Sequence, residues 1–260
     1  MIRFEHVTKT FGDQNVLDDL SFEIRKGEIF HIVGTSGAGK SVTLKHMVRL
    51  LSPTSGSVWL GDREISAADG RGLEEIREHF GYLFQSAALL GWMTVGENIA
   101  LPLREKTKLS EDEIEEKVQT ALKMVGLEDA GEKYPSEISG GMQKRAGLAR
   151  AIVRNPEIVL YDEPTSGLDP VTSRAIDRLI RDLNERLGIT SVVVTHDLYS
   201  SFLTATRIAM LSRGKFIEIG TPEQFAASTQ PEVRGFLDAQ GVGAGAIATA
   251  APYRPPEIGL

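Results

Sequence analysis

The chain has 260 residues, no cysteine and a formal net charge of -7 at pH 7. This length suits one large domain, or a main domain with a small lobe. The absence of cysteine excludes disulfide bonds and thiolate metal sites. The acidic balance argues against a nucleic-acid surface, which needs a basic stripe, so we expect no nucleic-acid partner.

We expect neither a signal peptide nor a membrane span. Residues 1–6 contain no apolar core of signal-peptide length. No run of about 18 or more apolar residues occurs anywhere in the chain. Composition and patterning therefore predict a soluble globular protein.

The first part of the chain is patterned as short strands with one helix. Alternation and apolar runs predict strands at residues 2–7, 16–24, 28–33 and 57–60. The segment 28–33 is almost continuously apolar, as in strands that are buried on both faces of a parallel sheet. A glycine-rich loop and a helix over about residues 40–51 follow it.

The middle of the chain is helical, and its clearest helix spans residues 110–125. Ser110 is placed to cap it, Glu113 completes a capping box, and apolar residues recur along one face. After this segment the strand and helix alternation returns. The expected elements are strands at 158–161, 191–195, 207–211 and 215–219 and a helix at 170–187. We predict one α/β core with an inserted helical lobe.

Residues 241–260 differ in composition from the rest. They are rich in Gly and Ala and then in Pro, so they cannot bury enough surface to fold alone. Tyr253 and Arg254 suit docking on a neighbouring chain, as an aromatic anchor beside a bidentate donor. The alternative is a disordered terminus without a role.

A phosphate-binding motif lies between the strand at 28–33 and the following helix. The sequence Gly-Thr-Ser-Gly-Ala-Gly-Lys-Ser at 34–41 matches G-x-x-x-x-G-K-[ST] in the expected context. Its glycines let backbone N–H groups point at an anion, and the helix N-terminus adds partial positive charge. The other interpretation is a glycine-rich turn that only joins strand to helix. The expected ATP-binding residues are Gly34, Thr35, Ser36, Gly37, Ala38, Gly39, Lys40, Ser41 and Val42.

Within this motif, Lys40 is expected to reach the β- and γ-phosphates, and the Ser41 hydroxyl to bind Mg²⁺. Asp162 and Glu163 follow the strand at 158–161, and ligands gather at the carboxyl ends of such strands. Asp162 is placed to hold Mg²⁺ through water, and Glu163 to polarise the attacking water. Alone, an Asp-Glu pair is an ordinary polar loop, but with the phosphate motif it indicates a P-loop NTPase.

A further motif resembles the signature of ABC ATPases. Ser139, Gly140 and Gly141 open a helix, and the resemblance implies that they cap the γ-phosphate held by a second copy of the chain. ATP would then join two subunits head to tail in a homodimer. The usual glutamine after these residues is Met142 here, with Gln143 one place later. We expect activity to survive this departure, because the serine and glycines make the phosphate contacts.

Four other residues stand in the order that the ABC family requires. Gln85 resembles the Q-loop glutamine, which touches Mg²⁺ and water. Asp169 resembles the D-loop residue, and Asp169 with Pro170 makes a helix start. His196 resembles the H-loop histidine, which contacts the γ-phosphate. Phe11 stands where the family has an aromatic ring that stacks on adenine.

The resemblance implies the fold of an ABC nucleotide-binding domain. That fold is a P-loop NTPase core with an antiparallel β subdomain and an inserted helical lobe. We expect the ATPase domain at residues 1–240, its lobe at about 86–150 and a tail at 241–260.

The sequences of three segments are similar to those of the ATPases of Mla (maintenance of lipid asymmetry) phospholipid transporters. They are Ser-Gly-Gly-Met-Gln-Lys-Arg at 139–145, Leu-Phe-Gln-Ser-Ala-Ala-Leu at 83–89 and Pro-Leu-Arg-Glu at 102–105. The resemblance implies that this chain lies peripherally at the cytoplasmic face of the inner membrane. It also implies a permease dimer, a periplasmic MCE lipid-binding protein and a small STAS-domain partner. An apolar stretch at 87–93 is expected to receive the permease, although it equally suits the core of the lobe.

Three alternatives remain open. An importer of a small polar solute uses the same ATPase. A soluble ABC ATPase of DNA repair or translation fits less well, because this chain has no cysteine and no room for coiled-coil insertions or a second ATPase domain. The expected catalytic residues are Glu163, His196, Gln85 and Lys40. A catalytically dead regulator is disfavoured, because Lys40, Ser41, Asp162, Glu163 and His196 are all present.

Overall fold

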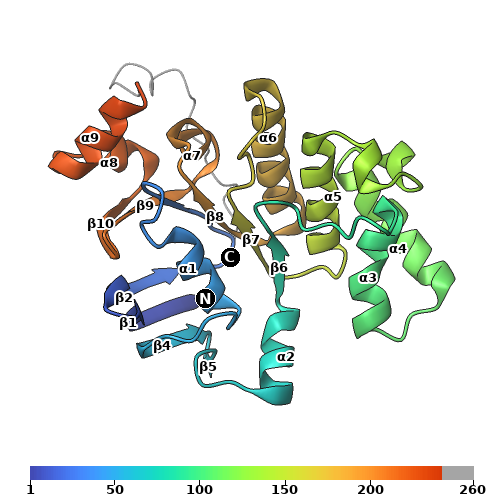
Figure 1. Cartoon of the computed structure of the whole chain (residues 1–260), viewed down its shortest axis with the longest axis horizontal. Coiled ribbons are helices and arrows are strands. Elements are labelled where there is room, and N and C mark those ends of the chain that lie inside the picture. Colours follow the sequence, from blue (N-terminus) through green and yellow to red (C-terminus); the bar gives the residue numbers. More distant parts are fainter. Residues whose placement is uncertain (242–260) are drawn as a thin grey trace, which may run out of the picture. The chain divides into compact units, whose positions relative to one another are not determined.

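The computed structural model describes residues 1–241, which divide into two compact units (Figure 1). The first unit comprises Met1–Glu78 and the chain from Thr190 onward, and the second comprises His79–Ile189. The expectations for Tyr253 and Arg254 lie outside the described residues. Within residues 1–241, no helix combines the length and the apolar character needed to cross a bilayer.

The first unit contains an antiparallel sheet with the strand order β2-β1-β4-β5. Its strands are β1 (Ile2–Phe11), β2 (Gln14–Ile24), β4 (Ser55–Leu60) and β5 (Arg63–Glu64). The predicted antiparallel subdomain is thus confirmed, but β1 is longer than the predicted strand at 2–7. Its register shifts between Phe4 and Val7, where His6 adopts a positive φ of 51°. The strand continues past this irregularity to Phe11. The irregularity breaks the alternation of the sequence, so the alternation alone predicts a shorter strand.

The first unit also contains the parallel strands that carry the phosphate motif. The strand β3 (Ile29–Val33) lies between β8 (Thr190–Thr195) and β9 (Arg207–Ser212) and is parallel to both. The strand β10 (Lys215–Gly220) pairs antiparallel with β9. All residues of β3 are buried, as predicted for a strand covered on both faces, and all residues of β8 are buried as well.

The helices of the first unit are α1 (Lys40–Met47), α2 (Gly70–Glu78), α7 (Leu198–Thr204), α8 (Pro222–Ala226) and α9 (Pro231–Ala239). Each of the last two begins with a Pro at its first helical position, where the missing N–H costs no hydrogen bond. One apolar cluster joins Val33 at the end of β3 to Leu198, Phe225, Val233 and Leu237. The C-terminal helices are therefore anchored to the same core as the strand that precedes the phosphate motif.

The second unit pairs β6 (Phe80–Leu83) in parallel with β7 (Ile158–Asp162). Its helices are α3 (Val95–Lys106), α4 (Glu111–Met124), α5 (Gly140–Ile152) and α6 (Pro170–Leu187), with 3₁₀ turns at Glu128–Ala130 and Pro135–Glu137. The predicted capping box of Ser110 and Glu113 is confirmed at α4. The helices α3, α4 and α5 contact one another and form the predicted helical lobe.

Candidate active site

The phosphate loop (residues 34–41) leaves β3 at Gly34 and enters α1 at Lys40. Gly34 and Gly39 adopt φ angles of 150° and 104°. A Cβ atom at Gly34 would collide with the carbonyl oxygen of Leu211, and one at Gly39 would lie 2.7 Å from the carbonyl oxygen of Val16. Only glycine fits at both positions, so the loop keeps its backbone close to the neighbouring strands.

Lys40 closes over the phosphate loop. Its ammonium donates hydrogen bonds to the carbonyl oxygens of Gly34 at 2.9 Å and Thr35 at 3.0 Å, and the residue is only 7% exposed. A buried ammonium beside a helix N-terminus and a glycine-rich backbone fits a polyphosphate anion.

The residues expected to bind Mg²⁺ are a hydroxyl, an amide and one carboxylate: Ser41, Gln85 and Asp162. Within residues 1–241, no group of three or more His, Asp or Glu gathers that could hold a metal ion by itself. Mg²⁺ is typically bound by one or two carboxylates together with substrate phosphates and waters, so a hydroxyl, an amide and one carboxylate suit it.

Phe11 lies at the end of β1 and is 47% exposed. The Lys9 ammonium lies 4.9 Å from the centroid of its ring. The ring is therefore not part of the core, which is the more common place for a Phe at the end of a strand. An exposed ring with a cation beside it suits stacking on a base.

His196 follows β8, as Gly34 follows β3. Val33 and Thr195 are register partners of these parallel strands, so the phosphate loop and the H-loop (residues 195–197) leave the same edge of the sheet. His196 is exposed there. Within the first unit, the structure thus brings together the two segments that were expected to contact phosphate.

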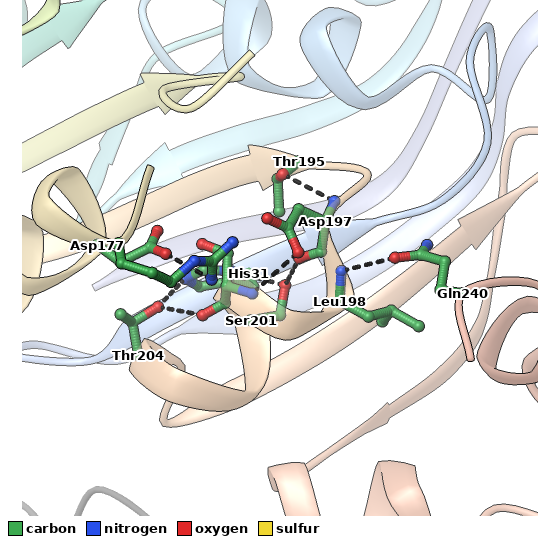
Figure 2. A network of polar contacts seen from close by, with 10 residues as sticks. His31, Asp177, Thr195, Asp197, Leu198, Ser201, Thr204 and Gln240 are labelled. Carbon is green, nitrogen blue, oxygen red and sulfur yellow. Dashed lines mark hydrogen bonds and ion pairs between the residues drawn. The ribbon is translucent and has the colours of Figure 1, made fainter. Parts of the chain in front are cut away.

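Gln240, the C-cap residue of α9, holds the backbone on both sides of Asp197, and Figure 2 shows its bond to Leu198. Its Nε2 donates to the carbonyl oxygen of His196 at 2.8 Å, and its Oε1 accepts from the backbone N–H of Leu198 at 3.0 Å. Asp197 lies between these two groups, and its N–H donates to the Thr195 hydroxyl at 3.0 Å. The peptide groups around His196 are therefore tied to β8 on one side and to α9 on the other.

A buried histidine fixes the helix that follows the H-loop (Figure 2). His31 of β3 lies 3.0 Å from the hydroxyl oxygens of Ser201 and Thr204, one at each ring nitrogen. Burial lowers the pKa of His31 to about 3, while the Asp197 carboxylate acts in the opposite direction. The ring is neutral at pH 7, so one ring nitrogen donates to one of the two hydroxyls and the other nitrogen accepts from the second hydroxyl.

In the second unit, Asp162 ends β7 and Glu163 follows it, and both are almost fully buried. Glu163 adopts a positive φ of 49°, which is uncommon outside glycine and concentrates at functional sites. The Tyr82 hydroxyl donates to the Asp162 carboxylate at 3.4 Å. Burial, together with the Asp162 charge, raises the pKa of Tyr82, so its hydroxyl keeps its proton.

Gln85 follows β6, which is parallel to β7 with Leu83 opposite Tyr161. Gln85 and Asp162 therefore leave the same edge of this pair of strands. Lys144 of α5 donates hydrogen bonds to two backbone carbonyl oxygens here, that of Gln85 and, at 3.2 Å, that of Glu163. Burial lowers the pKa of Lys144, and the Glu163 and Asp162 carboxylates oppose this shift.

The segment after Gln85 has an unusual backbone. Ala87 and Ala88 adopt positive φ angles of 60° and 49°. Arg150 of α5 donates to their carbonyl oxygens at 2.7 and 2.8 Å. Ala87 is buried, whereas Trp92 is 75% exposed. The apolar stretch at 87–93 thus divides between the core of this unit and its surface.

The signature segment begins α5. The Ser139 hydroxyl caps the helix by accepting from the Met142 N–H at 3.3 Å. A Cβ atom at Gly141 would collide with the methyl group of Thr172 on α6. Asp169, the cap of α6, accepts from the N–H groups of Val171 and Thr172 at 2.9 and 3.0 Å. The signature and D-loop segments therefore meet at Thr172.

The predicted residues fall into two groups. The first unit carries Phe11, the phosphate loop and His196, and the second carries Gln85, Asp162, Glu163, Asp169 and the residues 139–141. Sequence reasoning missed Lys144 and Gln240. Each contacts backbone far away in the sequence, so no local pattern marks either residue. The helix end at Gln240, before Gly241, was readable from composition, but its bonds to the H-loop were not.

Comparison with known proteins defines the family. The model of the family described as "ABC transporter" matches residues 17–166. This chain belongs to the ABC transporter family. It is 42% identical, over 93% of its length and 70% of the other protein, to a Mycobacterium leprae protein named "Probable ribonucleotide transport ATP-binding protein mkl". It is also 42% identical to a methionine import ATP-binding protein of Geobacillus kaustophilus, over 91% and 70% of the two chains.

Solved structures of the family agree with this fold. One is a dimeric, post-hydrolysis state of an ATP-binding cassette bound to ADP and Pi, with a TM-score of 0.79 and 35% identity over 85% of this chain and 99% of the other. Another is cbiO1 of Clostridium perfringens, part of the ABC transporter complex cbiONQ. It has a TM-score of 0.80 and 28% identity over 92% and 94% of the two chains.

The ABC ATPase is therefore the ATP-binding subunit of a transporter. Members of this family bind ATP with Mg²⁺ and hydrolyse it. ABC cassettes dimerise and act with transmembrane permease components. The fold class predicted from the sequence is confirmed.

Proposed function

We propose that this ABC ATPase drives the movement of phospholipids between bacterial membranes from the cytoplasmic face of the inner membrane. The observation that carries this proposal is a contact between two of the three segments whose sequences resemble Mla ATPases, residues 139–145 and 83–89. Lys144, from residues 139–145, donates to the Gln85 carbonyl oxygen, from residues 83–89. Two of the three Mla-like segments thus meet in one local structure.

The relatives named for methionine import favour a second candidate, an importer of a small polar solute. The ATPase site is the same in both candidates, because the substrate is bound by the permease. The two candidates therefore differ only in the partners and in the cargo.

The roles proposed for the nucleotide site divide between holding ATP and activating water. The phosphate loop and Lys40 hold the β- and γ-phosphates, and Phe11 stacks on adenine. Ser41, Gln85 and Asp162 hold Mg²⁺, which neutralises phosphate charge when it is bound. Glu163 polarises the attacking water, and its position is set by the strained backbone at the end of β7. His196 contacts the γ-phosphate.

The signature acts on the partner subunit. Ser139, Gly140 and Asp169 are exposed, so these residues are accessible to a second copy of the chain. Gly141 is buried against Thr172 and permits the close approach of α5 and α6. The N-terminus of α5 adds partial positive charge for a γ-phosphate bound by the other protomer.

The proposed permease contact centres on Trp92. The neighbouring backbone is held by Arg150, so the exposed ring is presented from a fixed segment. Trp is enriched among the residues that contribute most to binding energy at protein interfaces, so Trp92 is the candidate anchor of this contact. A periplasmic MCE protein and a small STAS-domain protein complete the proposed complex.

Purification of the tagged chain from native membranes, with mass spectrometry of bound proteins and lipids, tests this proposal. We expect a permease, an MCE protein and enriched phospholipid. Trp92→Ser should lose the permease and keep the ATPase activity of the isolated chain. Leu50→Ser is the matched control, since Leu50 is also exposed, at 49%, but lies in the first unit. A permease that purifies with a solute-binding protein and no enriched lipid would favour the importer.

A further inference from the structure

Lys144 occupies a position that the proposed roles do not explain. It lies on α5, five residues after the cap Ser139, and it is only 6% exposed. A buried ammonium is costly unless its hydrogen bonds are satisfied. Lys144 donates to the carbonyl oxygens of Gln85 and Glu163, the two proposed catalytic residues of the second unit.

These two bonds reach segments in which residues adopt an uncommon, positive φ. Glu163 has a positive φ, and two residues with positive φ follow closely after Gln85. A hydrogen bond to a carbonyl oxygen restrains the peptide plane, and with it the backbone from which the side chain leaves. One lysine thus restrains the backbone at both residues.

The same helix begins with the signature. In the proposed dimer, Ser139 contacts ATP of the partner, whereas Gln85 and Glu163 serve ATP of their own subunit. We propose that Lys144 is a positioning residue that couples the signature helix to Gln85 and Glu163 of its own protomer. This inference rests on the proposed function. Through Lys144, closure of the signature segment on the ATP of one subunit adjusts the water-activating groups at the ATP of the other subunit.

Arg145 provides a matched control. It is the next residue on α5, and its guanidinium also donates to two backbone carbonyl oxygens, those of Val125 at 3.0 Å and Gly126 at 2.7 Å. Neither of these carbonyl groups belongs to a proposed catalytic residue. Arg145→Met therefore removes the same number of bonds from the same helix without touching Gln85 or Glu163.

Lys144→Met keeps the length of the side chain and removes its donors. We expect ATP turnover to fall by about tenfold or more, because two bonds that orient catalytic groups are lost. ATP binding should stay within about twofold of wild type. Arg145→Met should keep most of its turnover, and Lys144→Arg should recover part of it. Wild-type turnover in Lys144→Met would overturn the proposal.

Mixed dimers show on which site Lys144 acts. Full-length Lys144→Met chains are mixed with Ser139→Ala chains and, separately, with Glu163→Gln chains, and phosphate release is measured. If Lys144 positions Glu163 of its own protomer, the Ser139→Ala mixture regains one intact site. About a quarter of wild-type activity should return, since half of a random mixture is mixed dimer with one working site of two. The Glu163→Gln mixture should stay inactive.

The opposite pattern, with recovery only in the Glu163→Gln mixture, would mean that Lys144 serves the signature in trans, and it would overturn the proposal. The reference mixture of Ser139→Ala with Glu163→Gln must regain activity if the head-to-tail site itself is correct. Failure of that reference mixture contradicts the proposed function rather than the role of Lys144. If Lys144→Met does not fold, Lys144→Gln, which reaches at most one carbonyl oxygen, replaces it in both mixtures.

Discussion

The side-chain amide of Gln240 donates to the carbonyl oxygen of His196 at 2.8 Å, across 44 residues of sequence. The same amide accepts from the N–H of Leu198 at 3.0 Å. Donor and acceptor both match, so the bonds fix the orientation of the amide as well as the H-loop. The position of His196 therefore depends on α9, an element that carries none of the predicted site residues.

Replacing Gln240 should impair catalysis without unfolding the protein. We expect Gln240→Ala to lower kcat several-fold, about threefold to tenfold, and to leave the affinity for ATP unchanged. Stability should fall by less than about 1 kcal/mol, because water replaces the bonds of an exposed side chain. Asp238→Ala is the control, since Asp238 lies on the same helix and its carboxylate pairs only with Arg234 in the described structure. Equal kcat in the two variants would remove Gln240 from the site.

His31 should make the protein sensitive to acid. The pKa of His31 is about 3 when folded and near its ordinary 6.5 when unfolded, so between these values the unfolded chain binds the extra proton. This contribution to stability is complete above pH 6.5 and is lost as the pH falls toward 3. Its slope is at most about 1.4 kcal/mol per pH unit.

Urea unfolding at pH 7.5 and pH 5 measures this contribution. His31→Gln should be less stable at the higher pH but should lose less stability on acidification. Burial also lowers the pKa of His46, which contributes with the same sign, so the comparison of variant with wild type isolates His31. A variant that lost stability as steeply as wild type would show that His31 does not titrate in this way.

Gly141→Ala should block hydrolysis while leaving ATP binding intact. The new methyl group would meet the Thr172 side chain, and overpacking of this kind costs about 1–3 kcal/mol. Thr172→Ser removes the opposing methyl group and keeps a hydroxyl that can donate to Asp169. The double variant should therefore recover turnover that Gly141→Ala loses. If Thr172→Ser gave no recovery, the close approach of α5 and α6 would not be the cause.

The tail expectation is tested by truncation after Gln240, which keeps the H-loop contact. We expect the fold and ATP binding to remain and the assembly of the complex to weaken. Gel filtration of the complex and transport measurements report this effect. An unchanged elution profile with unchanged transport would leave residues 241–260 without a role in assembly.

The sequence predicted secondary-structure elements better than it predicted the long-range contacts between them. The start of α6 at Asp169 and Pro170 and the capping box at Ser110 were confirmed, because both depend on a few consecutive residues. The end of β1 at Phe11 was missed, because an irregularity near His6 interrupts the alternation. The site motifs were found in the same way, since glycine spacing is local.

The bonds that hold those motifs were not predictable from the chain. Lys144 and Gln240 each bind the backbone of residues that are distant in sequence. Every residue has a backbone carbonyl oxygen, so the sequence does not show which one is bound. The same holds for His31, whose ring meets two hydroxyls of α7 only after β3 and α7 have packed. Long-range polar contacts of this kind require the tertiary structure.

The central claim is that two copies of this chain enclose ATP and that Glu163 then activates water. Glu163→Gln keeps the shape and size of the side chain and removes the carboxylate. Sedimentation of this variant with and without Mg-ATP tests the claim most directly, with Lys40→Ala as the control for nucleotide binding. We predict an ATP-dependent dimer with turnover reduced by at least about a hundredfold, and a monomer that binds ATP weakly for Lys40→Ala. A Glu163→Gln variant that stays monomeric in ATP, or that hydrolyses ATP at the wild-type rate, would contradict the account.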